Sequence, residues 1–187
     1  LLYFCLLATK TRGAWLGFFF SLSVFFYYVK QKKYYPKRFI AILAILSLVT
    51  IFYNVLSENS FLTRFVSIFT DIENVVSQAA DFEKAGANRI FIWKGALQLI
   101  KENPILGTGI ETFSIVFKQN QPTYFFKAHN EYLNIAQSTG IPSLLVYLIW
   151  LCAVIKAGIE ATQQKAVALP ILASVVGYAV QAFFNVS

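Results

Sequence analysis

The sequence predicts an all-α protein, a polytopic transmembrane helical bundle that carries a large, mostly helical extracytoplasmic loop. Three observations support this fold class. Hydrophobic residues make up 57% of the 187 residues and charged residues only 13%, which is about half the charged share of a soluble domain. The apolar residues gather in blocks of the length needed to cross a lipid bilayer. One long polar stretch separates two groups of such blocks.

The first group of apolar blocks covers residues 1–53. Leu1–Ala8 is too short to span and starts without Met, so we expect it to be the end of a helix whose beginning is missing. Ala14–Val29 and Phe39–Tyr53 are predicted transmembrane helices. The basic turn between them, residues 30–38, holds five Lys or Arg residues. The positive-inside rule places this turn in the cytoplasm, so the net charge of +7 indicates membrane topology and not nucleic-acid binding.

The polar stretch, residues 54–140, is predicted to be an extracytoplasmic loop domain. It holds eight of the nine acidic residues and seven Lys or Arg residues, and no run long enough to span. If residues 30–38 are cytoplasmic, this loop and the polar break at Thr9–Gly13 face the same outer compartment. Residues 141–187 then supply two further transmembrane helices, which we expect at Ile141–Ala157 and Val167–Phe184.

The first helix expected inside the loop begins at Asn88, a good N-cap, and runs to about Lys101. It is stopped by Pro104, because the residue before a proline is disfavoured in the helical region. Its apolar face is predicted from a 3-4-3 spacing of Ile90, Trp93, Leu97 and Ile100. A second, short helix is expected over Glu111–Lys118.

The last helix of the loop is predicted to begin at His129 or Asn130 and to reach about Ser138. Gly140 suits the C-terminal end of this helix, and Pro142 suits the first turn of the transmembrane helix that follows. The sequence therefore places a helix N-terminus directly at its only histidine.

His129 is the first candidate for chemistry. No second histidine and no nearby cysteine accompany it, so a zinc site is not expected. At a helix N-terminus the positive end of the dipole lowers the pKa of an imidazole, which keeps it neutral and able to accept a proton. Considered alone, His129 could equally be an ordinary histidine of a surface loop.

Two arginines are the next candidates. Arg12, with Lys10 beside it, lies at the outer rim, where the positive-inside rule disfavours cations. Arg89 shares a helix face with Trp93 at i and i+4 and lies in a first helical turn, where an anion is favoured. A guanidinium binds phosphate oxygens in a bidentate way, so both arginines could hold an anion. The alternatives are a snorkelling Arg12 and a surface Arg89.

Two acid-x-acid pairs, Asp71–Glu73 and Asp81–Glu83, could hold a metal-bound nucleotide only on an extended backbone, because residues two apart on a helix face different ways. We therefore expect no metal site and no cofactor. Cys5 and Cys152 both lie in apolar blocks and are expected to be buried free thiols.

Four motifs occur in order along the chain: TKTRGAWL at Thr9–Leu16, NRIFIWKGA at Asn88–Ala96, NPILGTGIETF at Asn103–Phe113, and AHNEYL at Ala128–Leu133, which is followed by Thr139-Gly140. They resemble the T-x-[ST]-R-G, R-x-x-x-W-x-x-A, N-P-x-x-G-x-G and H-N-x-x-L elements of the C-terminal portion of the O-antigen ligase and O-antigen polymerase (Wzy-type) superfamily. Each motif alone is weak, but four in this order around a large external loop are specific.

The resemblance implies a multi-pass glycosyltransferase of the bacterial inner membrane. Such enzymes move a glycan from an undecaprenyl-diphosphate carrier to a hydroxyl of a glycan, lipid or protein, without a metal or a nucleotide sugar. By this resemblance His129 is the catalytic base, and Arg12 and Arg89 bind the diphosphate. Asn130 would orient His129 or the sugar, Trp93 would stack or pack, and Lys10 would support the site.

The resemblance does not separate ligase, polymerase and protein O-glycosyltransferase. An alternative from another class is a non-catalytic lipid-linked-oligosaccharide transporter, similar to a flippase. A transporter driven by ions would need ionisable residues inside its spans, and the predicted spans hold almost none.

Overall fold

The computed structural model describes residues 1–31, 36–59, 61–67, 70, 85–117 and 125–184. In its first part, helix α1 (Leu2–Ala8) is followed by α2 (Arg12–Gln31) and α3 (Pro36–Leu56). These helices confirm the three apolar blocks predicted before residue 54. The central part of the basic turn, residues 32–35, lies outside the described residues.

The polar stretch contributes three labelled helices, α5 (Ala85–Glu102), α6 (Phe113–Val116) and α7 (Glu131–Thr139). The chain then continues into α8 (Ile141–Gln164) and α9 (Ala168–Ala182). All of these labelled elements are helical, as the sequence predicts.

Helices α2 and α8 are each long and apolar enough to cross a membrane. Helix α3 and the short helix Phe61–Ser67 pass the same test only as a pair, and they are bent by 102° at the break between them. Helix α9, with 15 residues, is a shorter apolar helix. The described part of the chain therefore has two candidate spans, or three if the bent pair is one span, which is typical of a membrane protein.

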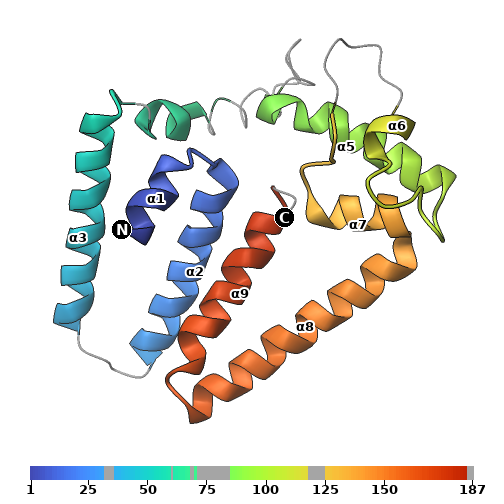
Figure 1. Ribbon diagram of the computed structural model, residues 1–187. Coiled ribbons are helices and arrows are strands. Elements are labelled where there is room, and N and C mark those ends of the chain that lie inside the picture. The colour runs from blue at the N-terminus through green and yellow to red at the C-terminus, as the bar shows by residue number, and fades with distance from the viewer. Residues whose placement is uncertain (32–35, 60, 68–69, 71–84, 118–124, 185–187) are drawn as a thin grey trace.

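Figure 1 shows how these helices bring distant segments together. The start of α2, the end of α9 and the group formed by α5, α6 and α7 all lie at one end of the long helices. The last turn of α2 and the connection between α8 and α9 lie at the other end. The Thr9–Gly13 break and the helices α5, α6 and α7 of the polar stretch thus lie at the same end of the long helices.

Helices α2 and α9 pack directly against each other through glycines. A Cβ atom built on Gly17 would lie 2.6 Å from the carbonyl oxygen of Gly177, and one built on Gly177 would lie 2.9 Å from the carbonyl oxygen of Gly17. The backbones can approach this closely only because neither residue has a side chain, as in other small-residue helix contacts in membranes. This contact fixes the start of α2 against the end of α9.

The polar stretch has a small core of its own. Ile92 and Ala96 of α5 pack with Phe113, Phe117 and Ala128, and all five are buried. The apolar face predicted for α5 is only partly confirmed: Ile100 is buried and Ile90 and Trp93 are half-buried, but Leu97 is 48% exposed, and Ile92, Ala96 and Leu99 are buried instead. The reason is that the stacked rings of Phe113 and Phe117, 4.9 Å apart, cover a face of α5 that its own periodicity does not reveal.

The turn before α6 is bound to the last turn of α7. The Thr108 N–H donates to the Gln137 carbonyl at 2.8 Å, and the Gly109 N–H donates to the Ser138 carbonyl at 3.0 Å. The N–H of Ile141, the first residue of α8, donates to the Pro104 carbonyl at 2.8 Å. Helix α7 is thus held between the turn and α8.

Three predictions about the chain need correction. Asn88 does not cap α5 but lies inside it with φ 64°, because the helix extends back into Ala85-Gly86-Ala87; asparagine tolerates this left-handed conformation better than most residues. The helix expected over Glu111–Lys118 is shortened to α6. The cysteines Cys5 and Cys152 are free, as expected, but both are exposed and not buried.

Candidate functional site

His129 lies immediately before the N-cap of α7 and is held in a left-handed conformation with φ 51°. Such a conformation is uncommon for residues other than glycine and often occurs where a side chain is aimed for function. The residues on both sides, Ala128 and Asn130, are buried, whereas His129 itself is exposed. The imidazole is therefore accessible while its backbone is anchored.

Trp93 provides one of the two anchors. Its indole nitrogen donates a hydrogen bond to the carbonyl oxygen of Ala128 at 3.0 Å. Its ring also packs edge-on against Phe183 of the chain after α9, with ring centroids 5.3 Å apart. Trp93 therefore packs, one of the two roles that the resemblance implied, and it ties α5 to the residue before His129.

Asn130 provides the second anchor as the N-cap of α7. Its side-chain oxygen accepts a hydrogen bond from the Leu133 N–H at 3.0 Å, and the residue is only 2% exposed. An N-cap of this kind satisfies one of the unpaired N–H groups of the first helical turn. Asn130 thus holds the backbone next to His129, with its oxygen directed into the helix.

Arg89 lies close enough to His129 for its charge to act on the imidazole. Partial desolvation of the imidazole, which remains accessible, lowers the pKa of His129 below its ordinary value, and the positive charge of Arg89 lowers it further. The direction agrees with the sequence prediction, but the causes are desolvation and Arg89 and not the helix dipole. A neutral imidazole at neutral pH can accept a proton.

Phe184 links Arg89 to the start of α2. The guanidinium of Arg89 lies over the Phe184 ring, 5.9 Å from its centroid, at a distance typical of a cation–π contact. A Cβ atom built on Gly13 would lie 2.6 Å from the Cβ of Phe184. Arg12, the first residue of α2, precedes this glycine. The structure thus brings the first, second and fourth sequence motifs to one end of the molecule (Figure 1).

Lys10 lies in the turn between α1 and α2, with φ 52°. Its carbonyl oxygen accepts a hydrogen bond from Nη1 of Arg64 at 3.5 Å. A third arginine thus lies beside the turn that carries Lys10 and Arg12. No sequence motif indicated Arg64, because it falls between the first two motifs.

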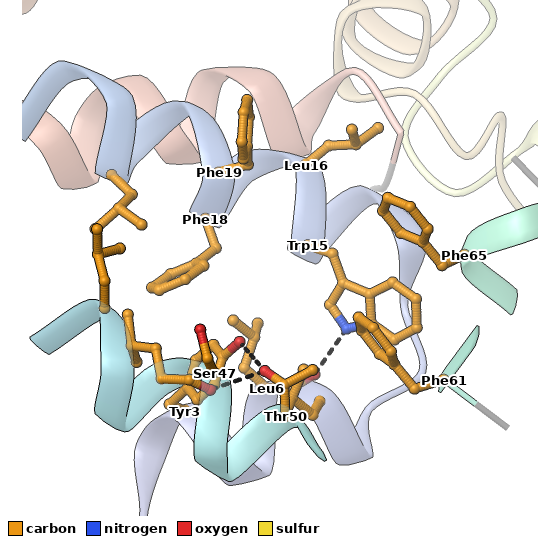
Figure 2. A pocket seen from close by; sticks show the side chains of 14 residues that line it. Tyr3, Leu6, Trp15, Leu16, Phe18, Phe19, Ser47, Thr50, Phe61 and Phe65 are labelled. Carbon is orange, nitrogen blue, oxygen red and sulfur yellow. Dashed lines mark hydrogen bonds between the residues drawn. The ribbon is translucent and has the colours of Figure 1, made fainter. Parts of the chain in front are cut away.

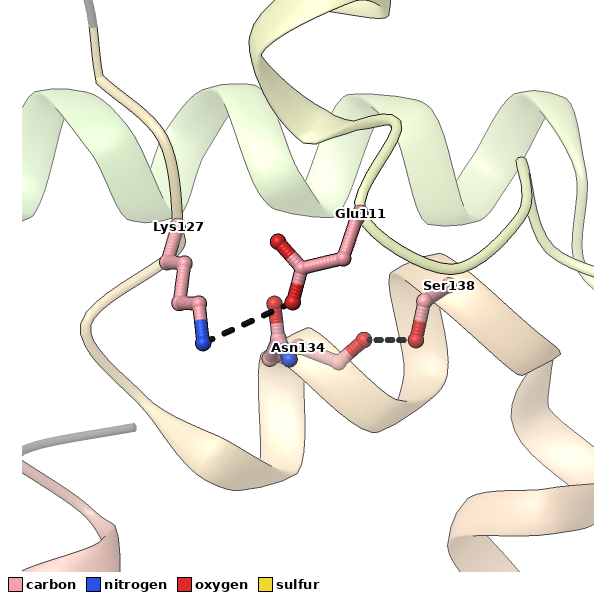
Figure 3. Close-up of polar contacts among 4 residues, drawn as sticks. All are labelled: Glu111, Lys127, Asn134 and Ser138. Carbon is pink, nitrogen blue, oxygen red and sulfur yellow. Dashed lines mark hydrogen bonds and ion pairs between the residues drawn. The ribbon is translucent and has the colours of Figure 1, made fainter. Parts of the chain in front are cut away.

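Polar side chains cover the side of α7 that faces the turn before α6 (Figure 3). Lys127, two residues before His129, forms an ion pair with Glu111 at 3.5 Å. Asn134 lies beside Glu111 in this view, and its carbonyl accepts a hydrogen bond from Ser138 at 2.7 Å. The ion pair between Glu111 and Lys127 and the amide of Asn134 therefore lie near the start of α7, and of these three residues only Asn134 belongs to that helix.

An apolar cavity of about 420 Å³ lies between α1, α2, α3 and the helix Phe61–Ser67 (Figure 2). The rings of Trp15, Phe61 and Phe65 line one part of it, and Tyr3 and Thr50 share a hydrogen bond of 2.7 Å in another part. The Trp15 indole donates to the Leu6 carbonyl at 3.2 Å, which holds this ring in place. The cavity is part of the apolar region below the Lys10–Arg12 turn.

Sequence reasoning missed Phe183 and Phe184, because their letters belong to an apolar block and look like ordinary span residues. Only their position at the end of α9 shows that they contact Trp93 and Arg89. The two acid-x-acid pairs, Asp71–Glu73 and Asp81–Glu83, lie outside the described residues. Within the part of the chain that the structure describes, His, Cys, Asp and Glu residues form no group of three or more that could hold a metal ion.

No curated protein matches the chain significantly. The family model described as O-antigen ligase matches residues 1–148, which include the four sequence motifs and every site residue predicted from the sequence. The match covers well over half of the chain. The chain therefore belongs to the O-antigen ligase family, and its apolar helices and family membership together indicate a membrane glycosyltransferase.

Proposed function

We propose that the protein transfers a glycan from an undecaprenyl-diphosphate carrier to an acceptor hydroxyl on the outer face of the bacterial inner membrane, with inversion and without a metal. The observation that carries the proposal is that the charge of Arg89 acts on the imidazole of His129, whose backbone is anchored by the contact of Trp93 with Ala128. A base and an anion-binding group from separate motifs thus lie within electrostatic reach of each other.

In the proposed reaction His129 removes the proton of the acceptor hydroxyl as a bond forms from its oxygen to the anomeric carbon. The bond from that carbon to the diphosphate oxygen breaks, and the diphosphate leaves with the electron pair. Arg12 and Arg89 stabilise the charge that develops on the leaving group. Attack on the face opposite the leaving group inverts the anomeric configuration.

The lowered pKa of His129 supports its role as the base. An imidazole that was already protonated could not accept the acceptor's proton, so burial and the charge of Arg89 both favour the reactive form. The anchors on both sides of His129, from Trp93 and Asn130, support precise positioning of the imidazole. Held geometry of this kind contributes much of the rate in transfer reactions.

The test is glycan transfer by His129→Ala in the protein inserted in its native membrane. Transfer should be lost while insertion and the amount of protein stay unchanged. Lys101→Ala, which changes an exposed residue at the far end of α5, is the matched control and should keep transfer. Normal transfer by His129→Ala would contradict the assignment of the base.

Arg89→Lys tests the diphosphate role. An ammonium keeps the charge but does not bind phosphate in a bidentate way, so transfer should fall clearly even though the charge is kept. An unchanged rate would make Arg89 an ordinary surface residue.

The acceptor class is tested by the glycans of a deletion strain. Carrier-linked long chains accumulate if the protein is a ligase, and only single units remain if it is a polymerase.

A further inference from the structure

The helix Phe61–Ser67 is positioned by Asn54, a residue near the end of α3. The side-chain oxygen of Asn54 accepts a hydrogen bond from the Leu62 N–H at 3.2 Å, and its nitrogen donates to the Asn59 side chain at 2.8 Å. Glu58 and Asn59 both have positive φ values, 51° and 64°, and turn the chain. The result is the bend of 102° that directs this short helix across the molecule towards α2.

Aromatic rings hold the short helix against the start of α2. The ring of Phe61 packs on Trp15 with centroids 4.7 Å apart, and Phe65 stacks on Phe61 at 6.0 Å. Trp15 lies one helical turn after Arg12. The side of the short helix that carries these rings therefore faces the first turn of α2 (Figure 2).

Arg64 lies between these two phenylalanines in the sequence, and its guanidinium reaches the Lys10–Arg12 turn. Its Nη1 donates to the Lys10 carbonyl at 3.5 Å. The acceptor is a neutral group, so this contact leaves the positive charge of Arg64 in place. An exposed guanidinium carries five N–H donors, and this contact uses one of them.

Arg64 thus lies at the turn that carries Lys10 and Arg12, because its guanidinium contacts the backbone of that turn. This is the end of α2 that is far from Lys30, and topology does not call for positive charge there. An anion bound between these two segments would be attracted by the positive charges of both. Below them lies the apolar cavity lined by Trp15, Phe61 and Phe65.

We infer that Arg64 is a further donor-binding residue, which contacts the diphosphate of the lipid-linked donor together with Arg12. This inference rests on the proposed function. The combination of cations above an apolar cavity fits an anion attached to a hydrocarbon chain better than a free anion. Arg64 binds the leaving group at the Arg12 end of the site, whereas Arg89 acts at the end that carries His129.

The direct test is binding of undecaprenyl diphosphate, added as the probe, to the purified protein in nanodiscs of a neutral phospholipid. Arg64→Gln should raise the dissociation constant about tenfold or more, the usual effect of losing a charge-assisted contact. The dissociation constant of Arg64→Lys should lie between those of the wild type and Arg64→Gln, because lysine keeps the positive charge but cannot bind phosphate in a bidentate way. Lys101→Gln, which removes an exposed cation outside the site, should bind like the wild type.

Steady-state transfer gives an independent readout. Arg64→Gln should raise KM for the donor while KM for the acceptor stays unchanged, because only the donor carries the diphosphate. A merely structural role would lower the thermal stability and change both KM values together. Wild-type affinity in Arg64→Gln would overturn the inference.

Two controls separate this inference from the proposed function. His129→Ala should bind the probe normally, because it lacks only the base. If the wild type itself did not bind undecaprenyl diphosphate, the proposed function would fail along with the inference. If the wild type bound it and Arg64→Gln bound it equally well, only the role of Arg64 would fail. Competition by inorganic diphosphate as strong as that by the lipid would overturn the preference for a lipid-linked anion.

Discussion

The indole nitrogen of Trp93 donates a hydrogen bond to the carbonyl oxygen of Ala128, 3.0 Å away, directly before the only histidine of the chain. Ala128 is fully buried, so its carbonyl cannot turn to water instead. A side chain of α5 thus fixes the backbone from which the imidazole of His129 projects.

Trp93→Phe should therefore both destabilise the protein and slow transfer. Phenylalanine keeps a ring against Phe183 but leaves the Ala128 carbonyl without its donor, a loss of about 1–3 kcal/mol in the free energy of unfolding. Thermal unfolding in detergent, together with kcat, measures the two effects. Trp150→Phe, which changes an exposed tryptophan of α8, is the control, and equal effects of the two variants would contradict the prediction.

Asn130→Ala should destabilise the protein by about 1 kcal/mol, because the Leu133 N–H loses its cap. Asn130→Ser should restore most of the stability, since a serine hydroxyl can cap a helix equally well. Because the Asn130 side chain is 2% exposed, we expect Asn130→Ser to keep transfer as well. A stable Asn130→Ser variant without transfer would instead indicate that the amide contacts the sugar.

The pH dependence of kcat/KM for the donor should report His129, because this ratio reflects the pKa values of the free enzyme. The neutral, reactive imidazole is present above the pKa of His129 and is lost as the pH falls through it. Because this pKa is lowered, the acidic limb of the pH profile should lie below about pH 6.5, the ordinary pKa of a histidine. Arg89→Gln removes one of the two causes of the lowering. The acidic limb of the kcat/KM profile, measured at donor concentrations well below KM, should then move to higher pH.

Lys101→Gln is the control for this shift, because it removes an exposed charge at the other end of α5 and should leave the limb in place. A limb that moved to lower pH in Arg89→Gln, or did not move, would show that the charge of Arg89 does not act on the catalytic base.

Gly17→Ala should destabilise the protein through the contact between α2 and α9. The new Cβ would lie 2.6 Å from the Gly177 carbonyl oxygen, which is backbone and cannot move aside without the helix. We expect a cost of about 1–3 kcal/mol, seen as a lower Tm in detergent. Gly158→Ala is the matched control, because its Cβ would meet the flexible end of Leu172 at 3.0 Å, and its Tm should change little.

The sequence could predict the long helices because their length and hydropathy depend on local composition alone. It could also predict α7, since Asn130 and Gly140 mark its two ends through local backbone chemistry. The buried face of α5 is only partly the predicted one, because Phe113 and Phe117, from a different segment, decide which residues become buried. A periodic pattern describes one helix and not its neighbours.

The candidate site, like the fold, could be predicted from the sequence only in part. His129, Arg12 and Arg89 could be singled out because their types and motifs suggest proton transfer and anion binding. The contacts between distant segments could not be predicted from the sequence. These are the contacts of Phe184 with Arg89 and Gly13, and that of Arg64 with the Lys10 carbonyl. Contacts of this kind depend on packing between helices, which local patterns do not encode.

The contact between Gly13 and Phe184 also has a consequence for the order in which the protein is made. Ribosomes add roughly 5–20 residues per second, so about 10–30 s separate the synthesis of these two residues. During that interval Arg12 already lies at the membrane, but the ring that lies between it and Arg89 does not yet exist. The start of α2 and Arg89 are therefore joined through Phe184 only after α9 has been made, so this end of the molecule is completed last.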